Sequence, residues 1–147
     1  MKLSTRGRYG LMMMLDLAQH GTEEPVSLRA VADRQQLSES YLEQLVSPLR
    51  DAGLLRSVRG KQGGYMLARS PSEITVGDIV RAVEGPIAPV ECVNDQVEVD
   101  CPRYPECPTR SVWLRLRDSI TQVLDSINLA DLVADAEHGS HKLIDSL

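Results

Sequence analysis

The segment from residue 85 to residue 108 places the strongest constraint on how this chain of 147 residues folds. It holds five of the eight prolines, and it also carries five acidic residues, Glu91, Asp95, Glu98, Asp100 and Glu106. Because proline removes a backbone donor and fixes φ, this composition predicts a long loop in place of a helix or strand. The loop divides the chain into two blocks, and a loop of this length usually has a function.

All three cysteines lie in this loop, at Cys92, Cys101 and Cys107. The N-terminus is polar and basic, not signal-like, and structural disulfides are rare in the cytosol. Clustered thiols in such a chain therefore indicate a metal, a cofactor or redox chemistry. The spacings of eight and five residues fit a tetrahedral zinc site poorly. From spacing alone, an iron–sulfur cluster, a zinc site and a disulfide with one free thiol all remain open.

The block before the loop is expected to begin with three helices. Apolar residues recur at helical spacing from residue 5 to residue 20, and Gly21 ends this first helix. Ser27 is expected to cap a short second helix, and Ser38 a third helix whose apolar stripe leaves a polar face outside. Pro48 is expected to kink or loosen the third helix, because it removes one backbone donor.

Two short strands are expected at residues 54–58 and 65–68, on either side of the turn Arg59-Gly-Lys-Gln-Gly-Gly64. The glycines of this basic turn permit the positive φ angles that a hairpin tip needs. Two helices, a turn and a basic hairpin form a winged helix-turn-helix. The predicted fold is therefore mainly α with a small β-hairpin wing, followed by a long dimerisation helix.

The apolar residues after the loop recur at spacings of four, four, three and four residues. They are Val112, Leu116, Ile120, Val123 and Ile127. This pattern predicts the longest helix of the chain, and a second copy of the same helix is the economical partner for its apolar side. We therefore expect a homodimer through residues 109–127.

Capping signals set the remaining boundaries. Thr75 and Asp78 resemble a capping box that opens a helix, and Asn128 is placed to cap a last short helix. The expected organisation is a winged helix-turn-helix domain at 1–84, a cysteine loop at 85–108, dimerisation and packing helices at 109–136, and a flexible tail at 137–147.

The net charge of −5 conceals an asymmetry between the two halves. Residues 1–70 hold ten Lys and Arg against seven Asp and Glu, whereas residues 71–147 hold six against fourteen. A basic first half favours contact with a polyanion. Because no run approaches the roughly 18 apolar residues of a membrane span, we expect a cytoplasmic protein with no membrane partner.

The polar face of the third helix and the basic hairpin are candidates for reading DNA. The N-terminal residues of such a helix enter a major groove, where Glu43 makes sense mainly as an acceptor from cytosine N4. Arg59 and Lys61 at the hairpin tip are placed to enter a minor groove, and Arg56 can add to the phosphate-contacting surface. The candidate DNA-binding residues are Lys2, Thr5, Arg6, Arg8, Ser38, Ser40, Tyr41, Glu43, Gln44, Arg50, Ser57, Arg59, Gly60 and Lys61.

A polar helix face or a charged turn is, by itself, more often an ordinary solvated surface. Their coincidence in one winged helix-turn-helix favours DNA binding over a purely structural adaptor. A thiol-based enzyme is disfavoured, because no histidine base is placed near the cysteines and no phosphate-cradling glycine motif is present. We expect no catalytic residues.

Five short motifs resemble one known family. They are Lys2-Leu-Ser-Thr-Arg-Gly-Arg-Tyr9, Tyr41-Leu-Glu-Gln-Leu45, Leu49-Arg-Asp-Ala-Gly-Leu54, Ser57-Val-Arg-Gly60 and Gly63-Gly-Tyr65. They resemble the Rrf-type winged-helix regulators, and the branch most similar to this chain is the iron–sulfur cluster regulators of the IscR type. The resemblance implies a homodimer that reads palindromic double-stranded DNA operators, with the residues matching Tyr41, Glu43 and Arg59 contacting DNA.

The resemblance also implies a repressor of iron–sulfur cluster assembly genes, with a 2Fe-2S cluster bound by the three loop cysteines. In the IscR type a histidine three residues after the last cysteine completes the ligand set, but Arg110 stands there in this chain. A guanidinium stays protonated and offers no lone pair, so the fourth ligand is unknown. Candidates are a loop carboxylate, a group from the other subunit, or a small molecule.

Two further expectations concern the same loop. Without metal, its acidic residues are expected to raise the thiol pKa values and to favour an open, disordered conformation. Alternatives within the same fold are a nitric-oxide or redox sensor and a repressor of cysteine metabolism that needs no cluster.

Overall fold

The computed structural model describes residues 3–104 and 106–139. The helices and strands are α1 (Thr5–His20), α2 (Leu28–Gln35), α3 (Glu39–Asp51), β1 (Leu55–Val58), β2 (Gly64–Leu67), α4 (Val76–Glu84), α5 (Arg110–Asp125) and α6 (Leu129–His138). Two short 3-10 turns are η1 (Pro71–Glu73) and η2 (Glu91–Val93). The mainly helical fold with a two-stranded wing is as predicted.

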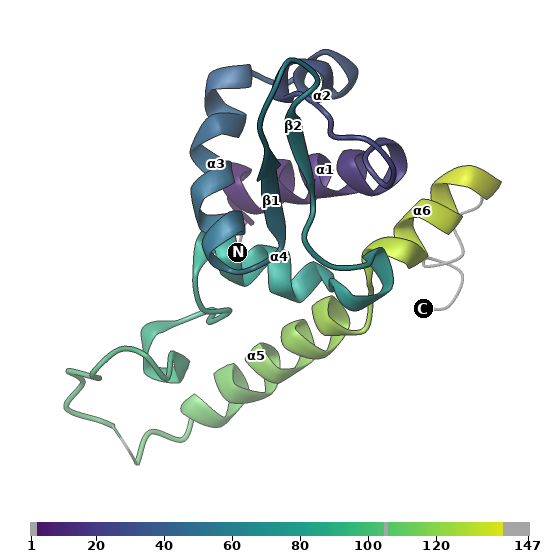
Figure 1. Ribbon diagram of the computed structural model, residues 1–147. Coiled ribbons are helices and arrows are strands. Elements are labelled where there is room, and N and C mark those ends of the chain that lie inside the picture. The colour runs from purple at the N-terminus through teal and green to yellow at the C-terminus, as the bar shows by residue number, and fades with distance from the viewer. Residues whose placement is uncertain (1–2, 105, 140–147) are drawn as a thin grey trace.

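The elements up to α4 form one body around α1, which packs against α2, α3 and α4 (Figure 1). Helix α5 leaves this body as a rod, and the cysteine loop lies beyond its N-terminal end (Figure 1). Helix α6 returns to pack against α1. The loop is therefore held at both ends, by α4 on one side and by α5 on the other.

The predicted caps are present at the starts of four helices. The Ser27 and Ser38 side chains accept hydrogen bonds from the backbone N–H groups of Ala30 and Tyr41, at 3.2 and 3.4 Å. Complete capping boxes open α4 and α6, each with an Asp at the third helical position. These local bonds satisfy N–H groups that have no partner inside the helix.

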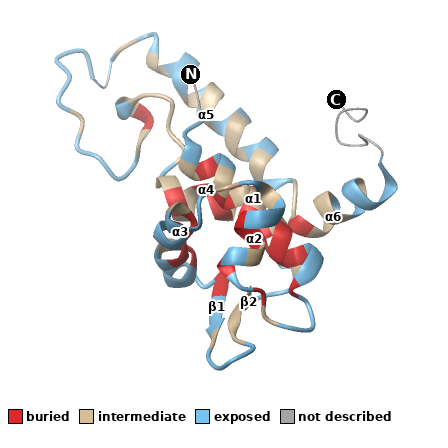
Figure 2. Cartoon of the chain, turned by 90° about the horizontal axis from the view of Figure 1, so that it is seen from above, coloured by how far each residue is buried: buried red, intermediate tan, exposed pale blue. Residues whose placement is uncertain are grey.

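The core lies between α1, α3 and α4. Met13, Leu17, Leu42, Leu45 and Ile79 are fully buried there. Figure 2 shows the buried residues concentrated in this body. Helix α5 contains no buried residue along its whole described length. Its apolar side is therefore only partly covered in a single copy of the chain, with Val112, Trp113 and Val123 exposed.

The wing is attached to the segment before α2 near the tip end of β2. Strands β1 and β2 pair antiparallel, with Val58 opposite Gly64. Beyond them, Val26 and Tyr65 exchange two backbone hydrogen bonds of 3.0 and 2.8 Å. A Cβ atom at Gly64 would collide with the Val26 carbonyl oxygen, so this close approach requires glycine. The segment that precedes α2 thus acts as a third, one-residue strand.

A buried ion pair connects α1 to α2. Asp16 is 0% exposed within an otherwise apolar core. Its carboxylate accepts hydrogen bonds from Arg34 Nε and Nη2 at 3.0 and 2.6 Å, and from Gln35 Nε2 at 2.9 Å. A buried carboxylate is tolerated only when its oxygens are satisfied in this way. The sequence analysis did not identify Asp16 as buried.

Several boundaries differ from the predicted ones. Helix α5 has 16 residues, as does α1, so it is not the longest helix. The strands shift by one residue, to Leu55–Val58 and Gly64–Leu67. Helix α3 continues through Pro48 to Asp51, because this proline lies in its last turn. Helix α6 continues to His138, and residues 140–147 of the predicted tail lie outside the described residues.

None of the helices within 3–104 and 106–139 is long and apolar enough to cross a membrane.

Removing Arg34 is expected to destabilise the fold more than removing Asp16. Arg34→Ala strands a carboxylate that is 0% exposed, at a cost of about 3–5 kcal/mol. Asp16→Ala leaves an arginine that is 37% exposed and can reach solvent, so it should cost about 1–3 kcal/mol. Urea unfolding followed by circular dichroism measures both. Arg29→Ala, an exposed residue of the same helix, is the control, and an equal cost for the two partners would contradict the buried-charge explanation.

Candidate functional site

The outward face of α3 is polar and accessible. Ser40, Glu43 and Gln44 are exposed, whereas the apolar stripe of the same helix is buried. Ser38 Oγ caps the helix and lies 3.0 Å from Ser40 Oγ. The predicted division of this helix into a core side and an outward side is confirmed.

The first turn of α1 lies beside the first turn of α3. The Tyr9 and Tyr41 rings meet edge to face, with centroids 5.6 Å apart and planes at 84°. The Arg8 guanidinium lies 5.6 Å from the Tyr9 ring centroid. Thr5 and Arg8 are exposed next to this pair. Two distant sequence segments therefore contribute to one surface.

Two of the predicted basic residues are placed differently from the rest. Arg6 is half-buried, and its Nε donates a 2.8 Å hydrogen bond to the Val83 carbonyl at the end of α4. Arg6 is thus tied to the protein itself. Lys2 lies outside the described residues.

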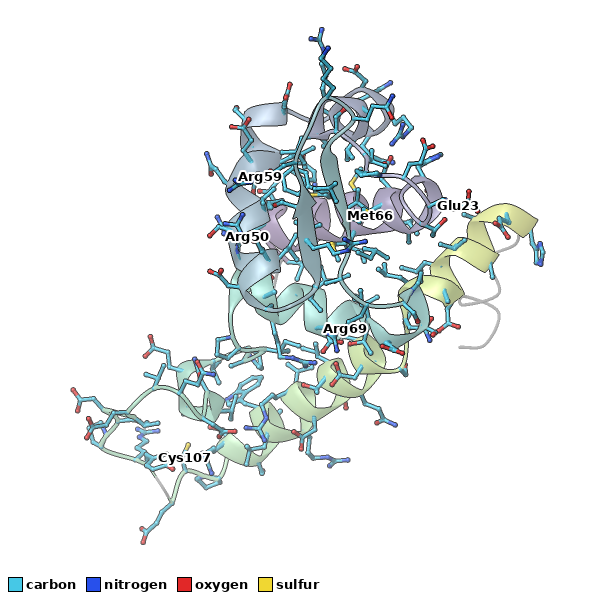
Figure 3. All side chains as sticks on the ribbon, in the orientation of Figure 1. Glu23, Arg50, Arg59, Met66, Arg69 and Cys107 are labelled. Carbon is cyan, nitrogen blue, oxygen red and sulfur yellow. The ribbon has the colours of Figure 1, made fainter. Side chains whose placement is uncertain are left out.

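The wing presents its basic residues to solvent. Ser57, Arg59, Gly60 and Lys61 are exposed, and Gly60 has φ of 120°, which favours glycine. Strand β1 packs against α3, so the hairpin and the helix lie side by side (Figure 1). Arg50 at the end of α3 is also exposed, and Figure 3 places Arg50 and Arg59 on this part of the molecule, far from Cys107.

The positive charges of this surface are available to a ligand. Among the described residues, no ion pair engages Arg8, Arg50, Arg59 or Lys61. Arg56 Nη2 contacts only the soft sulfur of Met66, at 3.3 Å. An exposed polar helix beside an unpaired basic hairpin has the chemistry required to contact base edges and phosphates.

The three cysteines are free thiols that the fold does not gather. Cys101 is exposed, while Cys92 in η2 and Cys107 just before α5 are half-buried. Within residues 3–104 and 106–139, no three or more His, Cys, Asp and Glu side chains are positioned to hold a metal ion. Thiolates are suitable iron–sulfur ligands. The donor set therefore fits a cluster in its chemistry, and the loop must close before it can bind one.

Arg110 stands where the resemblance implied a histidine ligand, and it makes structural contacts there. Its Nε donates a 3.1 Å hydrogen bond to the Cys92 carbonyl oxygen, and its guanidinium lies 4.8 Å from the Tyr104 ring centroid. Cation–π contact and hydrogen bond together hold two distant points of the loop. Arg110 thus stabilises the loop without offering a lone pair.

Arg117 makes a second attachment two helical turns further along α5. Its Nη1 donates to the Val93 carbonyl oxygen at 2.9 Å, and the Asp95 carboxylate lies 3.4 Å away. Val93 is 1% exposed, so the end of η2 is packed as well as hydrogen-bonded. The expectation of disorder is wrong for this part, whereas the expected open arrangement, with the thiols apart, is what the structure has. The spacing of Arg110 and Arg117, which puts both on one helix face, was the signal that sequence analysis missed.

The thiol pKa expectation is also wrong for Cys107. Its Sγ lies 3.0 Å from Thr109 Oγ1. The hydrogen bond from the Thr109 side chain lowers the pKa of Cys107, as do backbone N–H groups and the charge of Arg103, against a smaller effect of desolvation. Donors that contact the sulfur outweigh the acidic residues of the loop, because they act at hydrogen-bond distance.

Removing the Thr109 hydroxyl should make Cys107 less reactive. Thr109→Val is expected to raise the pKa of Cys107 and to slow its alkylation near neutral pH, by about threefold for each unit of pKa. Iodoacetamide labelling of the metal-free protein, with mass spectrometry of the peptide that contains Cys107, measures the rate. Thr109→Ser keeps the hydroxyl and should react like the native protein. Equal rates for Val and native protein would refute this cause.

Comparison with known proteins shows the family. The family model Rrf2, described as an iron-dependent transcriptional regulator, matches residues 3–135. The transcriptional regulator CymR of Bacillus subtilis is 51% identical over 134 residues, which are 91% of each chain. The regulator IscR of Aliivibrio salmonicida is 43% identical over 137 residues, 93% of this chain and 80% of that one.

Solved structures agree with these relatives. The structure of CymR, the global cysteine regulator of B. subtilis, superposes with a TM-score of 0.75 at 50% identity, covering 91% of this chain and 97% of that one. The structure of T. potens IscR gives 0.77 at 51% identity, covering 95% and 90%. The predicted winged-helix fold and the predicted resemblance are confirmed, and the chain belongs to the Rrf2 family of transcriptional regulators.

Proposed function

We propose that this protein is a dimeric repressor of iron–sulfur cluster assembly genes that reports iron–sulfur supply through its cysteine loop. The observation that carries the proposal is the presence of three free thiols in a loop anchored to α5, in a family of DNA-binding regulators. Similarity to IscR proteins over 93% of the chain supports this assignment.

The DNA interface is proposed to consist of α3 and the wing. The first turns of α3 enter the major groove with Ser40, Glu43 and Gln44 toward base edges, and Arg59 enters the adjacent minor groove. The remaining contacts, mainly to phosphates, come from Lys2, Thr5, Arg8, Ser38, Tyr41, Arg50, Ser57, Gly60 and Lys61. Arg6 joins them only through the guanidinium nitrogens other than Nε, because Nε is bonded to the Val83 carbonyl oxygen. Glu43 supplies specificity, since a carboxylate repels phosphate and is favourable only opposite a donor such as cytosine N4.

A second copy is proposed to cover α5. Val112, Trp113 and Val123 are 53%, 36% and 51% exposed on this helix, which has no buried residue of its own. An antiparallel pairing of two α5 helices would bury these side chains against each other and relate two α3 helices by a two-fold axis. Such a dimer matches a palindromic operator with two half-sites.

The cluster is proposed to be of the 2Fe-2S type, with Cys92, Cys101 and Cys107 as ligands. A bound cluster would supply a redox-sensitive and easily lost centre. Because the thiols are apart in the loop described here, binding requires the loop to close. The fourth ligand is proposed to come from a loop carboxylate, the other subunit or a small molecule. Of the loop carboxylates, Asp95 already contacts Arg117. The cluster shifts DNA affinity only through its different stability in the open and closed loops.

A second candidate function is a regulator of cysteine metabolism or redox state that uses the thiols without a cluster. The observation in its favour is the 51% identity to CymR, the global cysteine regulator of B. subtilis. The lowered pKa of Cys107 agrees with a thiol that reacts directly.

Metal analysis separates the two candidates. Protein purified under anaerobic conditions is expected to be reddish brown, with iron and sulfide in equal amounts and a paramagnetic signal after reduction. Each loop carboxylate is also replaced in turn by its amide. Only the replacement of a carboxylate that serves as the fourth ligand should alter the paramagnetic signal. Colourless protein with stoichiometric zinc would exclude the cluster. Colourless, metal-free protein whose DNA affinity changes on thiol oxidation would favour the second candidate.

Two substitutions test the DNA interface. Glu43→Ala should relax base selection at the position near cytosine, changing discrimination by about 1–3 kcal/mol, whereas Arg59→Ala should weaken binding most at sites with a narrow minor groove. Fluorescence anisotropy with operator and base-substituted duplexes at fixed salt measures both. Glu23→Ala, an exposed residue outside the interface, is the control. Unchanged binding profiles for both variants would refute the proposed docking.

A further inference from the structure

The N-terminus of α1 is capped by a residue of another helix. Ser4 precedes α1 but its side chain caps no backbone N–H group of the helix. Instead, Glu84 Oε1 accepts hydrogen bonds from Ser4 N at 2.9 Å, from Gly7 N at 3.4 Å and from Ser4 Oγ. N-terminal N–H groups lack partners within the helix and carry partial positive charge, so a carboxylate satisfies and stabilises them.

The same turn of α4 receives a second contact from α1. Arg6 Nε donates to the Val83 carbonyl oxygen at 2.8 Å. A carbonyl at a helix C-terminus also lacks a partner within its helix and favours a cation. The start of α1 and the end of α4 therefore satisfy each other's unpaired backbone groups. The Glu84 carboxylate accepts from N–H groups at the start of α1, and the Arg6 guanidinium donates to a carbonyl oxygen at the end of α4.

Gly7 makes room for this arrangement. A Cβ atom at Gly7 would lie 2.9 Å from the Glu84 carboxyl carbon and 3.0 and 3.2 Å from its two oxygens. Gly7 is buried and has helical backbone angles, so no unusual φ requires glycine here. Glycine instead leaves the space that the Glu84 carboxylate occupies. Any larger residue would push the carboxylate away from its donors.

The capped turn lies directly behind the proposed DNA-reading helix. Tyr9, two residues after Gly7, packs edge to face on Tyr41 of α3 at 5.6 Å. Thr5 and Arg8 are exposed on the same turn. A shift of this turn therefore moves both its own phosphate-contacting residues and the ring that supports the start of α3.

Glu84 is also the last residue of α4 before the cysteine loop. Gly85 follows with φ of 89°, a conformation that favours glycine and redirects the chain into the loop. The loop's first residues, with Leu3, Ile120 and Leu124, line an apolar cavity of about 300 Å³ beside Glu84. The beginning of the loop thus shares one cavity with α5 and with the segment that leads into α1.

We propose that Glu84 is a positioning residue that fixes the DNA-facing turn of α1 and connects it to the cysteine loop. The proposal rests on the proposed function for its DNA readout. A change in the path of the loop at Gly85 displaces Glu84, which uncaps Ser4 and Gly7 and releases the turn that carries Thr5, Arg8 and Tyr9.

Operator affinity tests the proposal, because the positioning role and simple electrostatics predict affinity changes of opposite sign. Glu84→Ala removes a negative charge, so simple electrostatics predicts tighter DNA binding. The positioning role predicts the opposite, a loss of roughly tenfold in operator affinity, on the scale of a lost helix cap. Glu84→Gln keeps an acceptor oxygen and should stay within roughly threefold of native, whereas Gly7→Ala should resemble Glu84→Ala. Glu73→Ala, an exposed acid of η1, is the matched control for charge.

Hydrogen exchange of the full chain provides a readout independent of DNA. In Glu84→Ala, but not in Glu84→Gln, the amides of residues 4–8 should exchange faster while the core of α3 stays protected. Alkylating the loop thiols with iodoacetamide should change exchange at residues 4–8 in native protein and not in Glu84→Ala. Equal or tighter operator binding by Glu84→Ala, or an alkylation effect that is identical in both proteins, overturns the proposal. Native protein that binds no operator contradicts the proposed function, and the exchange data then decide the capping role separately.

Discussion

The buried Asp16 carboxylate determines how the DNA-facing part of the molecule is assembled. Its bidentate contact with Arg34 and its bond from Gln35 attach the end of α2 to the middle of α1. The chain then turns at Gln36, which has φ of 55°, and enters α3. Because only this short turn separates the ion pair from α3, the direction of the outward polar helix depends on a carboxylate that has no contact with solvent. A charge in this position is costly unless every oxygen is satisfied, which makes the geometry specific.

Helix α4 has a comparable role between the winged domain and α5. At its start, Val76 N donates to the Ile127 carbonyl at 2.8 Å, and Leu129 N donates to the Ile74 carbonyl at 3.0 Å. Arg81 in its middle pairs with Asp125 at the end of α5, at 2.7 Å. The end of α4 carries Glu84, which reaches α1. One helix of nine residues therefore contacts both the rod that carries the loop and the turn beside the DNA-reading helix.

The cysteine loop combines two kinds of constraint. Its thiols are separated in space, but Arg110 and Arg117 attach its first half to α5 through carbonyl oxygens. At the position where the resemblance to the IscR type implied a histidine ligand, Arg110 makes a hydrogen bond and a cation–π contact within the chain. Relatives of both the CymR and the IscR kind share this fold at about half identity.

The sequence by itself determined the elements of this protein. Periodicity and capping residues identified α1 to α6, and the glycine-rich basic turn identified the wing, because these signals act over a few residues and depend on local backbone geometry. The outward residues of α3 and the position of the cysteines in a proline-rich loop were equally local. The motifs also led directly to the family.

Only the tertiary structure decided which charged residues form contacts with other segments of the chain. Five such residues are Asp16, Glu84, Arg6, Arg110 and Arg117, and each forms a hydrogen bond with a group 18 to 80 residues away along the chain.

 The separations along the chain are 18 residues for Asp16 with Arg34 and for Arg110 with Cys92, 24 for Arg117 with Val93, 77 for Arg6 with Val83, and 80 for Glu84 with Ser4. No local pattern encodes such a partner, because the pairing exists only when two elements pack together. The lowered pKa of Cys107 comes from near neighbours in the sequence, but it too depends on how the folded loop places Thr109 and Arg103 around the sulfur and not on the net charge of the loop.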